Sequence, residues 1–177
     1  MVVGFALGLW RASRVAKSKG VEPERVYDLG LIALLSGVLG ARLVFILINP
    51  ATESFRDFLS VWNGGLSFHG GVAFGVLAAL IYTKVVGLSF LRCADLLSPS
   101  LAIGYAFTRI GCFLNGCCYG APTSLPWGVR FYEHGVMTPP SHPTQIYAFF
   151  ASMLIFAILT RFEKMKRAPG FIFVSYL

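Results

Sequence analysis

Long apolar stretches alternate with short polar segments along this 177-residue chain. The stretch at residues 26–48 is long enough to cross a bilayer as a helix, which requires about 20 mostly apolar residues. The pattern predicts a set of membrane spans at about residues 1–12, 26–48, 69–86, 93–113 and 142–160, with the start of another at 170–177. We therefore predict an all-α fold, a polytopic integral membrane helical bundle that forms one domain over residues 1–177.

Two segments between the spans have a different pattern. In residues 51–63, large apolar side chains recur every three or four positions with charges between them, which predicts a helix lying on the membrane interface. These side chains are Phe55, Phe58, Leu59 and Trp62. Residues 116–141 hold four prolines and only two charges, Arg130 and Glu133, and this pattern predicts a loop.

Both ends of the sequence are short apolar runs. Residues 1–10 have their arginines after the run rather than before it, which is the opposite of a cleavable signal. The run at 170–177 stops well short of a span. We expect both terminal helices to be incomplete and the C-terminus to be truncated.

The composition excludes an ordinary soluble domain. Hydrophobic residues make up 56% of the chain and charged residues 13%, and the mean hydropathy is +0.70. The net charge of +7 comes from short basic clusters between apolar runs and not from a nucleic-acid patch. We expect membrane lipid as a partner and no nucleic acid.

The basic clusters also predict the orientation in the membrane. Eleven lysines and arginines fall in the loops assigned to the inside and only two, Arg56 and Arg130, in the opposite loops. This alternation agrees with the positive-inside rule. It places His69, the Arg109 end of its helix, the cysteine-rich turn after it and His142 at the outer face, where we expect one active site.

Two arginines lie within the predicted spans. A guanidinium presents a fixed fork of donors that matches a phosphate, so Arg109 and Arg42 are candidate partners for a phospholipid headgroup. Each could instead be a snorkelling arginine or the partner of an acid elsewhere. The polar turn directly after Arg109 favours function there.

His69 stands between Ser67-Phe68 and two glycines at the outer start of a span. Its imidazole can accept a proton near pH 7, and a glycine such as Gly70 allows a lipid or peptide to approach closely. An interfacial histidine bound to a loop carbonyl is the alternative. Gln145 and Tyr147 are further candidates for headgroup contacts, and their alternative role is to satisfy loop backbone.

The chain has four cysteines, Cys93, Cys112, Cys117 and Cys118. Their spacing is not typical of a metal site, so we expect no metal and no cofactor. We interpret them as small buried residues. Oxidation between Cys112 and one of the adjacent pair is the alternative.

Three stretches of the sequence resemble a known family in their residues and in their order. They are Gly64-Gly65-Leu66-Ser67-Phe68-His69-Gly70-Gly71, then the run from Arg109 through Asn115 to Gly120, then His142-Pro143-Thr144-Gln145-Ile146-Tyr147. In these the chain resembles the prolipoprotein diacylglyceryl transferases over nearly its whole length. Gly40-Ala41-Arg42-Leu43 and Ala94-Asp95 are also similar to that family.

The resemblance implies a bacterial inner-membrane enzyme, multi-pass with seven spans. It would transfer the diacylglyceryl group of phosphatidylglycerol to the lipobox cysteine of a prolipoprotein signal peptide, with glycerol phosphate leaving. The resemblance also implies that Arg109 contacts the phospholipid and that His69 is needed for activity. It places the family's asparagine and last signature glycine on Asn115 and Gly120, and a further essential arginine in a late helix beyond residue 177.

The chain departs from the family pattern at two signature positions. Cys112 stands where the family usually has asparagine, and Cys117 where it usually has glutamate. These two departures leave open that the protein is a paralogue that transfers the diacylglyceryl group to a different acceptor. Two further functions stay open at this point, a non-catalytic membrane transporter or lipid-binding protein and a thiol–disulfide protein that uses Cys112, Cys117 and Cys118.

Overall fold

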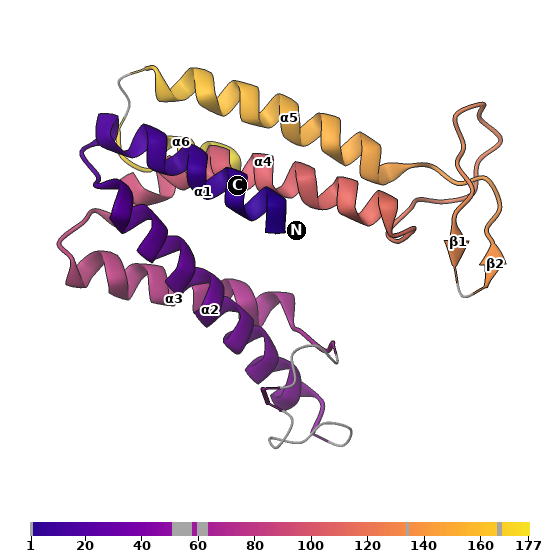
Figure 1. Ribbon diagram of the computed structural model, residues 1–177, viewed down its shortest axis with the longest axis horizontal. Coiled ribbons are helices and arrows are strands. Elements are labelled where there is room, and N and C mark those ends of the chain that lie inside the picture. The colour runs from indigo at the N-terminus through magenta and orange to yellow at the C-terminus, as the bar shows by residue number, and fades with distance from the viewer. Residues whose placement is uncertain (1, 51–57, 60–63, 134, 166–167) are drawn as a thin grey trace. The chain divides into compact units, whose positions relative to one another are not determined.

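The computed structural model describes residues 2–50, 58–59, 64–133, 135–165 and 168–177. Helices dominate these residues (Figure 1), as the sequence predicts. The helices are α1 (Val2–Ala16), the 3-10 turn η1 (Lys17–Lys19), α2 (Pro23–Ile48), α3 (Phe68–Val85), α4 (Phe90–Leu114), α5 (Thr144–Glu163) and α6 (Phe171–Tyr176).

Four of these helices, α2, α3, α4 and α5, are long and apolar enough to cross a membrane. The prediction of an all-α polytopic membrane protein is therefore confirmed. The predicted interfacial helix at residues 51–63 falls outside the described residues, except for a turn at Phe58 and Leu59.

The chain forms two compact units, and the first is Ala16–Cys93. Here α2 and α3 pack closely because glycines leave room for the opposite backbone. A Cβ added to Gly70 would lie 2.5 Å from the carbonyl oxygen of Gly40, and one added to Gly37 would lie 3.3 Å from that of Gly71. Further along the pair, the Tyr82 hydroxyl donates a hydrogen bond to Asp28 at 2.9 Å.

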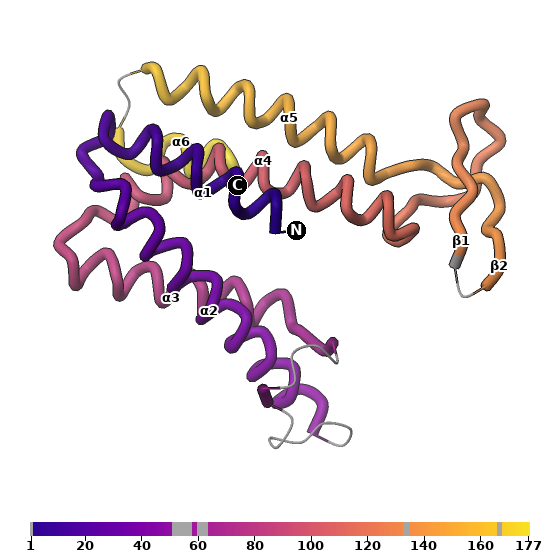
Figure 2. Tube along the Cα trace, viewed as in Figure 1, coloured from indigo at the N-terminus to yellow at the C-terminus, as the bar shows by residue number. Residues whose placement is uncertain are grey.

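The second unit combines Met1–Val15 with Ala94–Leu177. Glycines again set the spacing, because a Cβ on Gly4 of α1 would lie 2.8 Å from the Gly104 carbonyl oxygen of α4. Helices α4, α5 and α6 meet in a core formed by Ala102, Leu159 and Ile172, and Figure 2 traces the path of the chain through them. An ion pair between Arg11 and Glu163 joins α1 to α5.

Asp95 fixes the start of α6 in the second unit. One carboxylate oxygen accepts from the backbone N–H of Gly170 at 2.7 Å, and the other accepts from that of Phe173 at 2.9 Å. The first N–H groups of a helix generally need acceptors from outside the helix, and a carboxylate there also complements the helix dipole. A charged residue near the start of one apolar helix thus has a structural role in capping another.

The loop between α4 and α5 contains a short hairpin that the sequence pattern does not predict. Its strands are β1 (Tyr132–Glu133) and β2 (Val136–Met137), too short to show an alternating pattern. Isolated bridges from Ser141 to Pro122 and Val129 fold the end of the loop back onto its beginning. The start of α5 is thereby held against the turn that follows α4.

Candidate functional site

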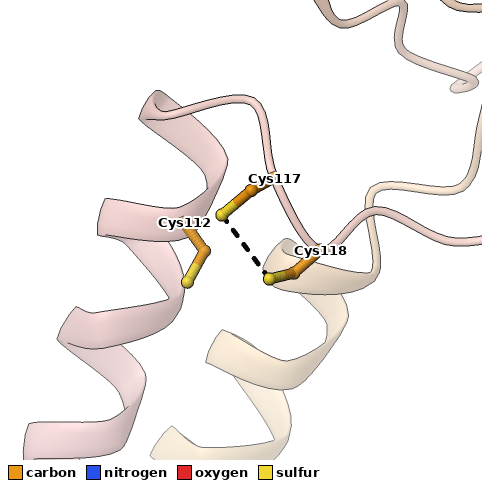
Figure 3. Close-up of side chains that lie close together, drawn as sticks. All are labelled: Cys112, Cys117 and Cys118. Atoms are coloured by element: carbon orange, nitrogen blue, oxygen red, sulfur yellow. Dashed lines mark hydrogen bonds between the residues drawn. The ribbon is translucent and has the colours of Figure 1, made fainter. Parts of the chain in front are cut away.

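The turn after α4 has the hydrogen bonds of a Schellman motif. Gly116 adopts φ of +69°, and its N–H donates to the Phe113 carbonyl at 3.1 Å. The N–H of Cys117 donates to the Cys112 carbonyl at 3.1 Å, which completes the motif. The chain therefore reverses sharply and returns Cys117 to the side of Cys112 (Figure 3).

The first turn of α5 holds this reversal in place. The Gln145 amide donates to the Cys117 carbonyl at 2.7 Å, and the Thr144 hydroxyl donates to the Cys118 carbonyl at 3.0 Å. Gln145 is fully buried. Cys118 has a φ of +63°, which is costly for a residue with a Cβ and persists only where neighbours enforce it. Gln145 therefore satisfies loop backbone, which was one of its two predicted roles.

Gly120 lies where the turn passes closest to α5. Its N–H donates to the His142 carbonyl at 2.8 Å. An added Cβ would lie 2.7 Å from Cγ2 of Thr144 and 3.1 Å from Cβ of His142. A side chain at this position would have to displace Thr144. Asn115 lies exposed just before the turn.

Tyr147 joins the loop to α5 through its hydroxyl. The hydroxyl accepts from the Trp127 indole N–H at 2.9 Å and lies 3.2 Å from Nδ1 of His142. Tyr147 remains exposed. The side chain is thus positioned at the surface of the same region as Gly120 and the cysteines.

Arg109 lies in the penultimate turn of α4 and is half-buried. Its Nε donates to the Tyr105 hydroxyl at 2.7 Å, and Nη2 makes a second bond to the same oxygen. Tyr105 is on the same helix one turn earlier, and no carboxylate among the described residues forms an ion pair with Arg109. Since a guanidinium has five N–H donors, most of the fork remains available to an anion.

Arg42 has a different environment in the unit Ala16–Cys93. Its side chain is 2% exposed, and Nη1 donates to the carbonyls of Gly64 at 3.0 Å and Gly65 at 3.2 Å. Both glycines have positive φ, +83° and +71°, so this turn depends on glycine. Arg42 therefore fixes the glycine turn that leads into α3. The sequence pattern did not predict this contact between Arg42 and the turn. The adjacent glycines at 64 and 65 were the feature that indicates such a turn.

His69 is exposed in the first turn of α3. Ser67 caps this helix by accepting from the Gly70 N–H at 3.4 Å, while its own N–H donates to the Ala41 carbonyl at 3.0 Å. Gly70 is buried, and the close approach to α2 accounts for its lack of a side chain. The imidazole is thus held on a capped helix end with its ring accessible.

The three cysteines of the turn lie together as free thiols. Their sulfur atoms are all within 4.8 Å of one another, and the Cys118 thiol donates to the Cys117 sulfur at 3.5 Å. That hydrogen bond, with a further one from Asn115, lowers the pKa of Cys117 below its usual value. The same bond raises the pKa of Cys118 because it favours the protonated donor. The spacing of the cysteines along the chain does not predict this cluster.

Each unit thus contains part of the set of candidate residues. Arg109, Asn115, Gly120, Gln145 and Tyr147 belong to the unit that contains α4 and α5, whereas Arg42, His69 and Gly70 belong to Ala16–Cys93. That the two sets meet at one membrane face stays a prediction.

The helices define an all-α polytopic membrane protein, with a half-buried arginine near the end of one span. A family model described as prolipoprotein diacylglyceryl transferase matches residues 1–177, and the chain belongs to this family. The resemblance seen in the sequence is therefore confirmed.

Curated relatives cover nearly the whole chain. A phosphatidylglycerol–prolipoprotein diacylglyceryl transferase of Clostridioides difficile (strain 630) is 33% identical over 100% of this chain and 70% of its own length. Proteins of the same name from Thermosynechococcus vestitus and Nitratidesulfovibrio vulgaris (strain DSM 19637 / Miyazaki F) are 30% and 36% identical, over 99% and 94% of this chain. The chain spans 69% and 64% of the length of these two relatives.

Proposed function

We propose that this protein transfers the diacylglyceryl group of phosphatidylglycerol to the lipobox cysteine thiol of prolipoproteins, the first step of bacterial lipoprotein maturation. Family membership supports the reaction class. The observation that carries the proposal is the guanidinium of Arg109, which lies near the end of a membrane span with only a neighbouring tyrosine as its hydrogen-bond partner among the described residues. Phospholipid headgroups are the anions that a membrane presents at that depth.

The reaction is a displacement at the glyceryl carbon that carries the phosphate. The thiolate sulfur of the acceptor forms a bond to this carbon, the bond from carbon to the phosphate oxygen breaks, and glycerol phosphate leaves. A free thiol has a pKa of about 8.5, so a base that removes its proton accelerates the attack. A fixed positive charge stabilises the negative charge that develops on the leaving group, most strongly where water is excluded.

The candidate residues divide between these tasks. Arg109 binds the phosphate, and His69 takes the thiol proton through its exposed ring. Asn115 holds the headgroup from the exposed end of α4.

The other candidates support this arrangement. Arg42 acts from a supporting position, through the glycine turn that precedes His69. Gly70 and Gly120 allow the close packing that positions His69 and the turn after α4. Tyr147 and Gln145 belong to the same region as Gly120.

We propose further that the protein lies in the bacterial inner membrane with this site toward the outer face. The basic residues support the orientation, because eleven fall in the loops assigned to the inside and two in the opposite loops. The acceptor is then the signal peptide of an exported protein.

A mass measurement tests the proposal. The protein, reconstituted with phosphatidylglycerol vesicles, is incubated with a lipobox peptide, and we expect the peptide mass to rise by one diacylglyceryl group. A peptide with serine in place of the lipobox cysteine, and vesicles of phosphatidylethanolamine, are the controls and should give no product. Binding of phosphatidylglycerol without any mass shift would instead identify a lipid-binding or transport protein.

A paralogue with another acceptor is the second candidate, and the cysteines at two signature positions favour it. The same vesicles supplied with a small-molecule thiol or a cysteine peptide lacking the lipobox distinguish the two. Transfer to these acceptors at the lipobox rate would support the paralogue, whereas transfer to the lipobox peptide alone supports the proposed function.

A further inference from the structure

The turn after α4 brings three thiols together, although the spacing of these cysteines along the sequence is not that of a metal-binding motif. Cys112 is in the last turn of α4, and Cys117 and Cys118 follow the reversal at Gly116. Figure 3 shows the three side chains directed into the same space. Their sulfur atoms lie within 4.8 Å of one another, and those of Cys117 and Cys118 are 3.5 Å apart.

These separations fit one small ion bound to three thiolates. A zinc–sulfur bond is about 2.3 Å long, so sulfurs around one ion are separated by about 3.8 Å in a tetrahedral site and about 4.0 Å in a trigonal one. The 3.5 Å separation of the Cys117 and Cys118 sulfurs is slightly below these values, and no separation among the three exceeds 4.8 Å. Shifts of the sulfur atoms by less than about 1 Å would bring all three to bonding distance.

The backbone of the turn is already fixed in the required position. The Schellman hydrogen bonds hold Cys117 beside Cys112, and bonds from Gln145 and Thr144 hold the carbonyls of Cys117 and Cys118. Cys118 is kept in a left-handed conformation that directs it back to the cluster. A site formed in advance lowers the ordering cost of binding.

Electrostatics favours the thiolate forms that a metal requires. Arg109 lies three residues before Cys112, so both are on the same face of α4 and its positive charge offsets the thiolates. Thiolate is the form that ligates metal.

We propose that Cys112, Cys117 and Cys118 form a three-thiolate site for a thiophilic metal ion, of which Zn²⁺ is the probe. Thiolate ligands select Zn²⁺ and Cu⁺ over harder cations. Among the described residues no histidine, aspartate or glutamate joins the three sulfurs, so the fourth position of a tetrahedral ion is open to water or an external thiol. The site does not rest on the proposed transferase function. It differs from the expectation, drawn from the spacing of the cysteines, that they hold no metal.

Metal content and thiol protection test this site. The reduced protein, purified in detergent, is equilibrated with Zn²⁺ against a competing chelator, and we expect one tightly held zinc per chain. Replacing any one of the three cysteines by serine should weaken zinc binding at least tenfold. The matched control is Cys93→Ala, which removes a buried cysteine elsewhere on α4 and should leave zinc affinity unchanged.

A second measurement needs no variant. Zinc should protect Cys112, Cys117 and Cys118 of the wild-type protein from alkylation, as read by peptide mass, and acid removal of the metal should restore their reactivity. Equal zinc content in the wild type and the triple serine variant would overturn the site. So would a disulfide between Cys112 and either neighbour in protein isolated without reductant, which would assign the cluster to thiol oxidation.

Discussion

Two arginines lie inside the apolar helices of this protein, and their side chains have contrasting partners. Arg42 of α2 is 2% exposed and donates to two carbonyls of the glycine turn before α3. Arg109 of α4 is half-buried and bonds only to Tyr105 of its own helix among the described residues. Both are charges in apolar spans, where an unsatisfied charge is costly.

The difference shows two ways in which the hydrogen-bond donors of an arginine in an apolar span can find acceptors. Arg42 is held by backbone acceptors of the protein itself, so its role is to fix a turn. Arg109 keeps donors that the described residues do not use, so a bound anion would complete its hydrogen bonding. The same residue type thus supports structure in one helix, and in the other it keeps donors that we propose bind a ligand.

The largest expected effect is on Arg109. We predict that Arg109→Ala lowers the rate of diacylglyceryl transfer by about 10²- to 10³-fold, the loss found when one stabilising donor is removed from a reacting anion. Arg109→Lys should restore part of the rate, because it keeps the charge but not the fork. The peptide mass assay measures both, with Arg130→Ala in the exposed loop as the matched control. Near-normal transfer by Arg109→Ala would remove this residue from the mechanism.

The corresponding change in α2 should act on stability. We predict that Arg42→Ala lowers the free energy of unfolding by about 2–4 kcal/mol, because two carbonyls of the glycine turn lose their donor within a buried site. Thermal unfolding in detergent measures this, and Arg109→Ala should leave the midpoint nearly unchanged. If Arg42→Ala kept wild-type stability but lost phosphatidylglycerol binding, Arg42 would be a direct lipid contact and the contrast between the two arginines would fail.

The sequence predicts the helices well because the bilayer imposes a length on them. Apolar runs at residues 26–48 and 142–160 correspond to α2 and α5 within about three residues at each end. The β1–β2 hairpin escapes prediction because strands of two residues have no periodicity to detect. Residue type alone is enough to single out Arg109 and Arg42, since a charge in an apolar span is rare.

The partners of these side chains could not be predicted, for a physical reason. The acceptors of Arg42 are carbonyls of residues 64 and 65, which approach it only after α2 and α3 pack. The cysteine cluster depends on the positive φ of Gly116, which reverses the direction of the chain. Cys117 therefore lies beside Cys112 in space, although five positions separate them in the sequence. Such contacts follow from backbone geometry and not from spacing.

Glycines next to the two arginine sites should show a smaller effect. We predict that Gly70→Ala destabilises the protein by about 1–3 kcal/mol, because the new Cβ would meet the backbone oxygen of Gly40 and force α2 and α3 apart. Gly120→Ala should cost less, since its Cβ would first meet a methyl group of Thr144, which can move. Thermal unfolding compares the two, and Gly111→Ala, whose Cβ would meet nothing within 4 Å, is the control. Equal midpoints for all three variants would contradict the packing explanation.

The smallest expected effect comes from Tyr105, which orients the arginine of α4. Tyr105→Phe removes the hydroxyl that accepts both bonds from Arg109 and keeps the ring, whose centroid lies 4.7 Å from the guanidinium carbon. One neutral hydroxyl contributes about 1 kcal/mol in such a setting, so we predict a rise in KM for phosphatidylglycerol of about fivefold with little change in kcat. A change in KM alone indicates that Arg109 has lost its orientation. Loss of its charge should instead lower kcat. A fall in kcat as large as that of Arg109→Ala would mean that Tyr105 itself contacts the reacting group and does not merely orient Arg109.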